Sequence, residues 1–269
     1  MNTFFTNKVV VVTGGTDGIG KALVNLLLLS DAKVATCGRS QSKLDELQNL
    51  HSTDSLLCIQ TDVSNQDDCK RFVDAAIHKF GGIDILINNA GISMKAEMVD
   101  CDAAVIKKVM DINFMGMVYC SKYAMPSIIA RKGTIAGISS IAGYRGLPGR
   151  SGYSASKFAM NGWLEALRTE LFESGVNVMW VCPGFTKSNI RNVALNESSQ
   201  SQGESPIDEN QLMSAEICAQ HILKAITKRK RTLVLTLRGK QTVWLNKLFP
   251  SWADKLTRNF FYRNGQLKQ

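Results

Sequence analysis

Short apolar runs rich in β-branched residues recur along the chain, and longer stretches of helical period separate them. The runs occupy residues 9–12, 33–36, 56–59, 83–87, 133–138, 176–181 and 232–237. The helical stretches include residues 19–29, 66–80, 103–130 and 153–174. Because strands that are apolar throughout must be covered on both faces, this alternation predicts an α/β chain with a doubly wound parallel sheet. Ligands of such sheets bind beyond the carboxyl ends of the strands, so functional residues are expected there.

A single domain accounts for most of the chain. With 269 residues, of which 45% are hydrophobic, the sequence suffices for one large core, and no repeat divides it. We expect this domain to span residues 1–237. Within it, residues 185–212 include the polar stretch NESSQSQGESP and are expected to form a lid over the substrate. Residues 238–269 are expected to form a basic, amphipathic C-terminal extension.

The net charge of +9 is concentrated at one end of the chain. Residues 224–269 hold 12 Lys or Arg residues against the single acid Asp254, whereas the first 223 residues hold 20 against 22 acids. A basic segment without a recognisable nucleic-acid-binding module is weak support for such binding. We therefore expect no nucleic-acid partner.

The cysteines and histidines argue against two classes of protein. Seven cysteines, odd in number and without a C-x-x-C pair, do not indicate a disulfide framework. Three scattered histidines lack metal-ligand spacing, so no metal site is expected. No apolar run approaches the roughly 18 residues of a transmembrane helix, and the first residues lack the apolar core of a signal peptide. The expected location is the cytoplasm.

Glycines cluster between the first strand and the first helix. In VVVVTGGTDGIG, Gly14, Gly18 and Gly20 stand where the backbone of such a fold approaches a pyrophosphate at a helix N-terminus. The spacing is G-x-x-x-G-x-G and not G-x-G-x-x-G. A plain strand-to-helix turn would explain the glycines as well, so only the context favours a phosphate site.

A tyrosine and a lysine lie four residues apart in SGYSASKFAMNG. If the segment is helical, Tyr153 and Lys157 share one face. A nearby cation favours the phenolate and lowers the pKa of a phenol from about 10 toward neutrality. The alternative is a surface lysine beside a half-buried tyrosine, and this pair alone does not exclude it.

Together the motifs resemble those of the short-chain dehydrogenase/reductases. They are T-G-x-x-x-G-I-G at residues 13–20, N-N-A-G at residues 88–91, Ser140, Y-x-x-x-K at residues 153–157, and P-G at residues 183–184. Their order and spacing match over residues 8–237. The resemblance implies a Rossmann fold and an oxidoreductase that transfers a hydride between a nicotinamide and a carbonyl or secondary alcohol. A catalytically silent NAD(P)-binding sensor or scaffold is the alternative.

The resemblance also implies roles for four catalytic residues. Tyr153 would be the general acid and base, and Lys157 would lower its pKa and hold the nicotinamide ribose. Ser140 would hydrogen-bond the substrate oxygen. Asn113 would hold a water against the lysine, unless it only kinks or caps its helix.

Cofactor contacts follow from the same resemblance. They are expected from Gly14, Thr16, Asp17, Gly18, Ile19, Arg39, Asp62, Val63, Asn89, Ala90, Gly91, Tyr153, Lys157, Pro183, Gly184, Thr186 and Ser188. Asp62 has a second interpretation as a turn or helix-cap residue, and residues 89–91 could simply end a strand.

Two residues give opposite indications about the cofactor. After the second strand, the acidic residue that would bind a ribose 2′-hydroxyl is missing, and Arg39 suits a 2′-phosphate. Asp17 argues against this, because relatives that prefer NADP often carry a basic residue at its place. The sequence favours NADP(H) and leaves NAD(H) open.

The substrate is expected to be a small carbonyl or alcohol with apolar surroundings. Candidate pocket walls are residues 93–98, 142–150 and 185–212, which include Met94, Met98, Tyr144, Leu147 and Phe185. The apolar character of these walls favours a lipophilic ketone or acyl thioester as the substrate. The resemblance further implies a homodimer or homotetramer that pairs through residues 103–130 and 153–174.

The C-terminal extension has an apolar face. Trp244, Leu245, Leu248, Phe249, Trp252, Leu256 and Phe260 fall within an arc of about 160° on a helix, flanked by lysines and arginines. Pro250 is expected to divide the segment into two short helices. The face would pack on the protein's own core or its dimer partner beside the substrate, or it would contact an anionic membrane surface peripherally.

Overall fold

The computed structural model describes residues 3–187, 189–201 and 212–267. Seven parallel strands form its central sheet, in the order β3-β2-β1-β4-β5-β6-β7. They are β1 Val9–Thr13, β2 Lys33–Gly38, β3 Leu56–Gln60, β4 Ile85–Asn88, β5 Thr134–Ile138, β6 Asn177–Cys182 and β7 Thr232–Val234. The α/β class with a doubly wound parallel sheet is therefore confirmed.

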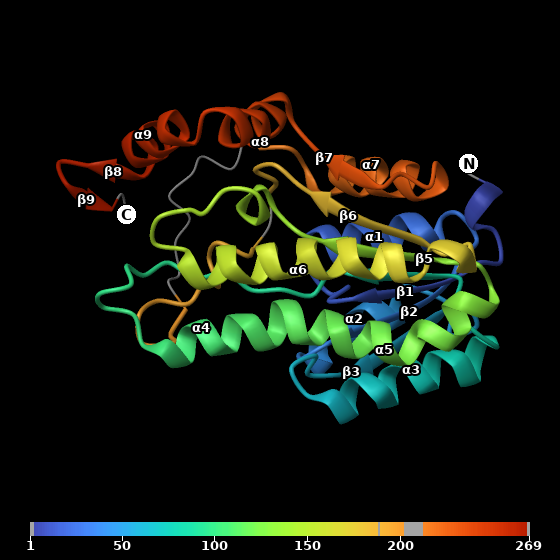
Figure 1. Cartoon of the computed structure of the whole chain (residues 1–269). Helices are drawn as coiled ribbons and strands as arrows, with labels where there is room; N and C mark the ends of the chain where they lie inside the picture. The colour runs from blue at the N-terminus through green and yellow to red at the C-terminus, as the bar shows by residue number, and fades with distance from the viewer. Residues whose placement is uncertain (1–2, 188, 202–211, 268–269) are drawn as a thin grey trace.

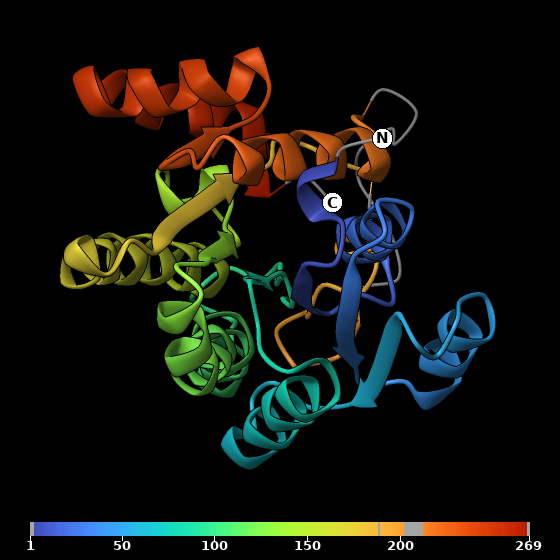
Figure 2. The same cartoon turned by 90° about the vertical axis from the view of Figure 1, so that its right-hand side faces the viewer.

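Helices cover both faces of this sheet (Figures 1 and 2). Helix α1 packs beside α7 on one face, while α3 packs beside α5, and α4 beside α6, on the other. The helices of the domain are α1 Gly18–Leu28, α2 Gln41–Asn49, α3 Gln66–Phe80, α4 Ala103–Met110, α5 Gly116–Ala130, α6 Ser151–Glu170 and α7 Ala215–Thr227.

Each face of the sheet has its own apolar core. Along β1, Val10 and Val12 belong to the core beneath α1 and α7, whereas Val11 belongs to the core beneath α3 and α6. Successive side chains of a strand point to opposite faces. This is why a strand between two helical layers must be apolar at every position, and why the continuous runs of the sequence predicted the fold.

The stretch 103–130, expected as one helix, contains a wider turn. Helices α4 and α5 are joined by a π-helical segment at Asp111–Met115. Such segments are rare and occur often at functional sites. Asn113, one of the catalytic candidates, lies inside it.

The strand order reverses between β1 and β4. Strands β2 and β3 follow on one side of β1, whereas β4 to β7 follow on the other. In sheets of this kind, ligands bind beyond the carboxyl ends of the strands at the point where the order reverses. The glycine-rich loop after β1 and the N-N-A-G turn after β4 lie at this point, and both line one cleft.

Two further helices follow the sheet, α8 Leu237–Leu248 and α9 Pro250–Phe261. The expected last strand, 232–237, ends at Val234 because Thr236 adopts a φ of 62° and caps α8 by accepting the Gly239 N–H. Pro250 divides the segment into two helices, as expected. A short hairpin of β8 Tyr262–Arg263 and β9 Gln266–Leu267 comes after them. Figure 1 shows α8 and α9 at the end of the molecule away from the N-terminus.

Candidate active site

Hydrogen bonds tie together the loops that follow β1 and β4. The Thr13 hydroxyl accepts the backbone N–H groups of Asn89 (2.9 Å) and Ala90 (3.0 Å). In return, Asn89 Nδ2 donates to the carbonyl oxygens of Thr13 (2.9 Å) and Gly14 (3.1 Å). Four bonds thus fix the glycine-rich loop against the N-N-A-G turn at the point where the strand order reverses.

Two glycines are required by how closely these loops approach. Gly14 has a φ of 69°, in the left-handed region, and a Cβ there would lie 3.0 Å from the Ala90 Cα. A Cβ on Gly20 would lie 2.1 Å from the Gly14 carbonyl oxygen and 2.5 Å from Asn89 Nδ2. The loop that leads into α1 is therefore compact, and Asp17 caps the helix by accepting the Gly18 N–H (2.7 Å). The N-terminus of α1 faces the cleft that Gly14, Thr16 and Gly18 line. This arrangement fits a dinucleotide pyrophosphate.

One large cleft of about 1390 Å³ gathers nearly all the expected site residues. Its lining includes Gly14, Thr16, Asp17, Gly18, Ile19, Arg39, Asp62, Val63, Asn89, Ala90, Gly91, Ser140, Tyr153, Lys157, Pro183, Gly184 and Thr186. Two of the expected site residues are not among those that line the cleft. Ser188 lies outside the described residues, and Asn113 lies behind the cleft wall with 1% of its surface exposed.

The ribose end of the cleft contains a cation that the sequence analysis missed. Lys43, in the first turn of α2, lines the cleft and forms an ion pair with Asp17 (Nζ to Oδ2, 3.1 Å). Arg39 is exposed at the same end, and Gln60 holds its carbonyl oxygen (3.0 Å). The ion pair offsets the negative charge of Asp17 at this end of the cleft. The sequence signal that could have identified Lys43 is its position four residues, or one helical turn, after Arg39.

Asp62 forms the turn that was one of its two interpretations. Its Oδ1 accepts from the Ser64 N–H (3.0 Å) and hydroxyl (2.7 Å), which forms a turn ahead of α3. The cap of α3 is the next residue, Asn65, and not Ser64. Asp62 and Val63 nevertheless border the cleft opposite the glycine-rich loop.

The reaction centre joins the end of β5 to the first turns of α6. Ser140 follows β5 and accepts the Ala142 N–H (3.1 Å), which starts a short 3-10 turn. Tyr153 points into the same part of the cleft from α6. Burial raises the pKa of Tyr153, while a hydrogen bond with Ser140 and the charges of Arg150 and Arg191 lower it.

Lys157 lies one helical turn after Tyr153 and is 3% exposed. Its Nζ donates to the Ile138 carbonyl oxygen (2.9 Å) and lies 5.6 Å from the centre of the Tyr153 ring. Burial lowers the pKa of Lys157 to about 8. Burial outweighs the opposing effects at Tyr153, so the pKa of this phenol is raised overall. The cations that partly offset the effect of burial are Arg150 and Arg191, which the sequence analysis had not selected for the reaction centre, and Lys157 is not among them.

Asn113 is bound entirely by protein groups. Its Oδ1 accepts the Ile92 N–H (2.8 Å), and its Nδ2 donates to the Ile92 carbonyl oxygen (2.9 Å) and the Ser156 hydroxyl (2.9 Å). Both amide protons are thus used. A Cβ on Gly91 would meet Asn113 Oδ1 at 3.1 Å and Lys157 Nζ at 3.6 Å, so the three residues are near neighbours. The π-helical turn brings Asn113 to this position.

Residues after β6 form another wall of the cleft, on the side where the sequence analysis expected the nicotinamide. Pro183 and Gly184 follow the strand, and a Cβ on Gly184 would lie 2.6 Å from the Thr236 side chain. Thr186 is 4% exposed, and its hydroxyl donates to the Gly184 carbonyl oxygen (3.2 Å). Thr186 also pairs with Met213, which anchors this loop to the segment ahead of α7.

Helices α8 and α9 line the other half of the cleft, beyond Ser140 and Tyr153. Trp244, Leu256 and Phe260 line this half of the cleft. The Phe260 ring stacks on the Phe185 ring, with ring centres 6.4 Å apart. Leu147 borders the cleft from the loop that precedes α6. Apolar side chains from this late segment therefore meet those of the main sheet domain across the opening.

Three of the expected pocket-wall residues do not line this cleft. Met94 is fully buried in the core, and Met98 is 59% exposed on the outside. The Tyr144 hydroxyl accepts a hydrogen bond from Trp180 Nε1 (2.9 Å), which turns the ring away from the cleft. Apolar character alone could not separate pocket positions from core positions.

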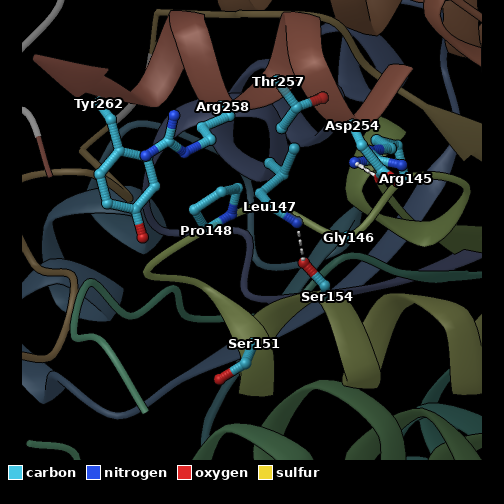
Figure 3. Close-up of a pocket in the computed structure, with 10 residues that line it drawn as sticks. All are labelled: Arg145, Gly146, Leu147, Pro148, Ser151, Ser154, Asp254, Thr257, Arg258 and Tyr262. Atoms are coloured by element: carbon cyan, nitrogen blue, oxygen red, sulfur yellow. Dashed lines mark hydrogen bonds and ion pairs between the residues drawn. The ribbon is translucent and has the colours of Figure 1, made fainter. Parts of the chain in front are cut away.

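A polar clamp holds α8 and α9 to the loop before α6. Arg145 pairs with Asp254 (2.5 Å) and also donates to Asn246 Oδ1 (3.0 Å), and Asn246 Nδ2 donates to the Tyr144 carbonyl oxygen (2.8 Å). Figure 3 shows α9 above this loop, with a side hollow of about 600 Å³ between them. The position of α8 and α9 over the cleft, called here the cleft roof, is thus set by contacts between residues that are far apart in sequence.

No cluster of three or more His, Cys, Asp or Glu side chains suited to a metal ion occurs within residues 3–187, 189–201 and 212–267. In the same ranges, no helix is both long enough and apolar enough to cross a membrane.

Known proteins resemble this chain over most of its length. A family model for short chain dehydrogenases matches residues 8–199. Dehydrogenase/reductase SDR family member 7B of Mus musculus is 34% identical over 240 residues, which cover 87% of this chain and 74% of that protein. Dehydrogenase/reductase SDR family protein 7-like of Anopheles gambiae is 32% identical over 253 residues, covering 91% of this chain and 80% of the relative.

Solved structures share the fold at lower identity. A short chain dehydrogenase/reductase from Burkholderia phymatum in complex with NAD has a TM-score of 0.79 at 23% identity, with 97% of both chains covered. A short chain dehydrogenase from Burkholderia cenocepacia in complex with NADP has a TM-score of 0.80 at 20% identity, covering 94% of this chain and 98% of the other.

Proposed function

The chain belongs to the short-chain dehydrogenase/reductase family, and from this premise we propose that it reduces the carbonyl of a lipophilic substrate, or oxidises the matching alcohol, with NADP(H). The observation that carries the proposal is the joint position of Ser140, Tyr153 and Lys157 at the carboxyl end of β5, in a cleft whose other half has the features of a dinucleotide site. The nicotinamide would supply or accept the hydride.

The chain's own residues would handle the proton. Tyr153 would donate its phenolic proton to the carbonyl oxygen during reduction and remove it in the reverse direction. Ser140 would donate a hydrogen bond to the same oxygen and stabilise the charge that develops there. Lys157, almost fully buried beside Tyr153, would hold the nicotinamide ribose and replenish the proton. Asn113 would fix the loop at Ile92 behind them.

The preference for NADP(H) is supported by two cations at the ribose end. Arg39 is exposed to the cleft and offers a guanidinium to a 2′-phosphate. Lys43 neutralises Asp17, the one residue of the glycine-rich loop that would repel that phosphate. Measured dissociation constants of NADPH and NADH would test the preference, and equal values would contradict it.

The apolar roof supports a lipophilic substrate. Trp244, Leu256 and Phe260 are each more than half exposed, and all three border the cleft. Burial of apolar ligand surface against them would contribute about 25 cal/mol per Å². A panel of ketones, 3-oxoacyl thioesters and steroids, assayed for NADPH oxidation, would identify the class.

The control for this assay is Tyr153→Phe, which keeps the ring and removes the proton. We expect it to bind NADPH as the unchanged protein does and to lose activity by a factor on the order of 10² to 10⁴. Full activity in the variant would refute the mechanism. NADPH binding without turnover of any carbonyl would instead favour a silent sensor or scaffold.

The oligomer that we propose is a dimer or tetramer that pairs across α4, α5 and α6. Two apolar side chains on these helices are exposed, Phe158 at 47% and Ile129 at 40%. Such a surface gains stability from burial against a second copy. Sedimentation at micromolar concentration would test it, and a monomer would contradict it.

Peripheral membrane contact is proposed for the outer surface of α8 and α9. Leu248, Phe249 and Trp252 are about half exposed or more and do not line the cleft, and Lys247 and Lys255 lie beside them. Basic and apolar groups together favour anionic bilayers. Flotation with anionic and neutral vesicles at low and high salt would test this, and absence of binding to both would leave the segment structural.

A further inference from the structure

The substrate half of the cleft is rich in arginine and poor in acids. Arg145, Arg150, Arg191 and Arg238 line the cleft. Among the described residues, the only carboxylates in its lining are those of Asp17 and Asp62, and both lie in the dinucleotide half. The positive charge around Tyr153 therefore has no lining carboxylate in the described part of the chain to balance it.

Two of these arginines have structural tasks. Arg145 pairs with Asp254 and Asn246 in the clamp that holds α8 and α9. Arg191 is 7% exposed, and its Nη2 donates to the Thr186 carbonyl oxygen (3.1 Å). The charge of Arg145 is thus neutralised locally, and Arg191 supports the loop on the nicotinamide side.

Arg150 is different, because only its backbone is engaged. Its N–H donates to the Leu147 carbonyl oxygen (3.1 Å), and its own carbonyl oxygen accepts the Ser154 N–H (2.8 Å). No hydrogen bond or ion pair within the described residues uses its guanidinium. The side chain is nevertheless half-buried in the cleft wall. A partly desolvated cation without a hydrogen-bonded or ion-paired partner is costly, and a ligand that pairs with it would remove this cost.

The loop around Arg150 is held from several sides. Gly149 has a φ of 68°, and its carbonyl oxygen accepts the Ala96 N–H (2.9 Å). The Leu147 N–H donates to the Ser154 hydroxyl (3.1 Å). Arg150 itself immediately precedes α6, one helical turn before Tyr153. The backbone of Arg150 is therefore held in place beside the reacting group, so its side chain extends from a fixed point into the cleft wall.

We propose that the substrate carries an anionic group, a carboxylate or a phosphate, close to the reacting carbonyl, and that the Arg150 guanidinium binds it. The planar fork of arginine matches either group with two parallel hydrogen bonds. The apolar remainder of the substrate lies against Trp244, Leu256 and Phe260. This inference rests on the proposed function and narrows its substrate class to amphiphilic anions.

Matched pairs of substrates test it. The pairs are 2-oxodecanoate with its methyl ester, and 1-hydroxydecan-2-one with its phosphate ester, each assayed for NADPH oxidation by the unchanged protein and by Arg150→Gln. We expect the anionic member to be favoured in kcat/KM at least tenfold, and the variant to reduce this preference roughly 10- to 100-fold. Because the preference is a ratio, a general effect of Arg150 on the pKa of Tyr153 cancels. The pair with the larger preference distinguishes carboxylate from phosphate.

A matched control removes a cation outside the cleft lining. Arg258→Gln removes an arginine that lines the side hollow under α9 (Figure 3) and not the cleft, so it should leave the preference unchanged. Arg150→Lys, which keeps the charge and loses the fork, should give an intermediate preference. Equal preference in the unchanged protein and Arg150→Gln, or a better neutral substrate, would overturn the proposal.

Binding provides a readout that does not depend on turnover. Calorimetry would measure decanoate, decyl phosphate and methyl decanoate with the NADP⁺-saturated protein. We expect at least one anion to bind the unchanged protein, at least tenfold weaker binding to Arg150→Gln, and unchanged NADP⁺ affinity in that variant. If these results hold but no carbonyl is reduced, the proposed function fails and the anion site stands. If carbonyls are reduced but neither anion binds better than the ester, the anion site fails alone.

Discussion

Replacing Gly20 by alanine should disrupt the dinucleotide half of the cleft without touching its chemistry. The added Cβ would lie 2.1 Å from the Gly14 carbonyl oxygen and 2.5 Å from Asn89 Nδ2. Because ordinary contacts of this kind are longer than 3 Å, the two loops must separate by roughly 1 Å, and overpacking of this size costs about 1 to 3 kcal/mol. The Asn89 bonds to Thr13 and Gly14 are lost with the shift, at about 1 kcal/mol each.

These terms predict that Gly20→Ala lowers the free energy of unfolding by about 3 to 5 kcal/mol. They also predict that NADPH affinity falls by a factor on the order of 100, because the N–H groups at the start of α1 are displaced. Chemical denaturation and fluorescence titration with NADPH would measure both quantities.

The matched control is Gly162→Ala on the exposed side of α6. A Cβ there would meet nothing within 4 Å, so the change should stabilise the helix by about 0.5 to 1 kcal/mol and leave NADPH binding unchanged. The reasoning is refuted if Gly20→Ala has the same free energy of unfolding as the unchanged protein and binds NADPH with an affinity within a factor of three of it.

Three further changes probe other parts of the structure. Arg39→Ala should narrow the gap between NADPH and NADH binding by roughly 1.5 to 3 kcal/mol, as measured by titration, and an unchanged gap would exclude a 2′-phosphate contact. The folded pKa of Lys157, about 8, lies below its ordinary value of 10.5, so the folded state binds fewer protons between these values and gains stability as the pH rises through that window. Unfolding by denaturant should therefore show the unchanged protein gaining about 2 kcal/mol relative to Lys157→Met between pH 8 and pH 10, whereas a constant difference would mean that the lysine is solvated. Asn246→Ala should loosen α8 and α9 and expose residues 237–261 to limited proteolysis, with little change in NADPH affinity, because its bonds to Arg145 and Tyr144 belong to the clamp and not to the dinucleotide half.

The sheet and its order of elements could be predicted because each determinant is local. Strands β1 and β5 are buried at every position, so the continuous apolar runs in residues 9–12 and 133–138 identified them directly. The expected site residues Gly14, Tyr153 and Lys157 stand at fixed spacings along single elements, and the structure brings them into one cleft. Pro250 marked the boundary between α8 and α9 for a similar reason, since proline starts a helix readily but cannot continue one.

Other features depend on contacts between distant segments, and no local pattern reveals them. The charge that reaches Tyr153 comes from Arg150 and Arg191, which the fold brings together across 41 positions of sequence. Met94 and Leu147 are equally apolar, yet only the packing places one in the core and the other in the cleft. The π-helical turn at Asn113 likewise interrupts a sequence that reads as one uninterrupted helix.

Transfer of a labelled hydride tests the central claim most directly. The unchanged protein, incubated with NADPH deuterated at the transferring carbon and a ketone identified in the panel, should give an alcohol that carries one deuterium at the former carbonyl carbon. Tyr153→Phe should bind the same cofactor and form no labelled alcohol within the same time. An alcohol without deuterium, or equal labelling by the variant, would contradict the account of hydride transfer assisted by Tyr153.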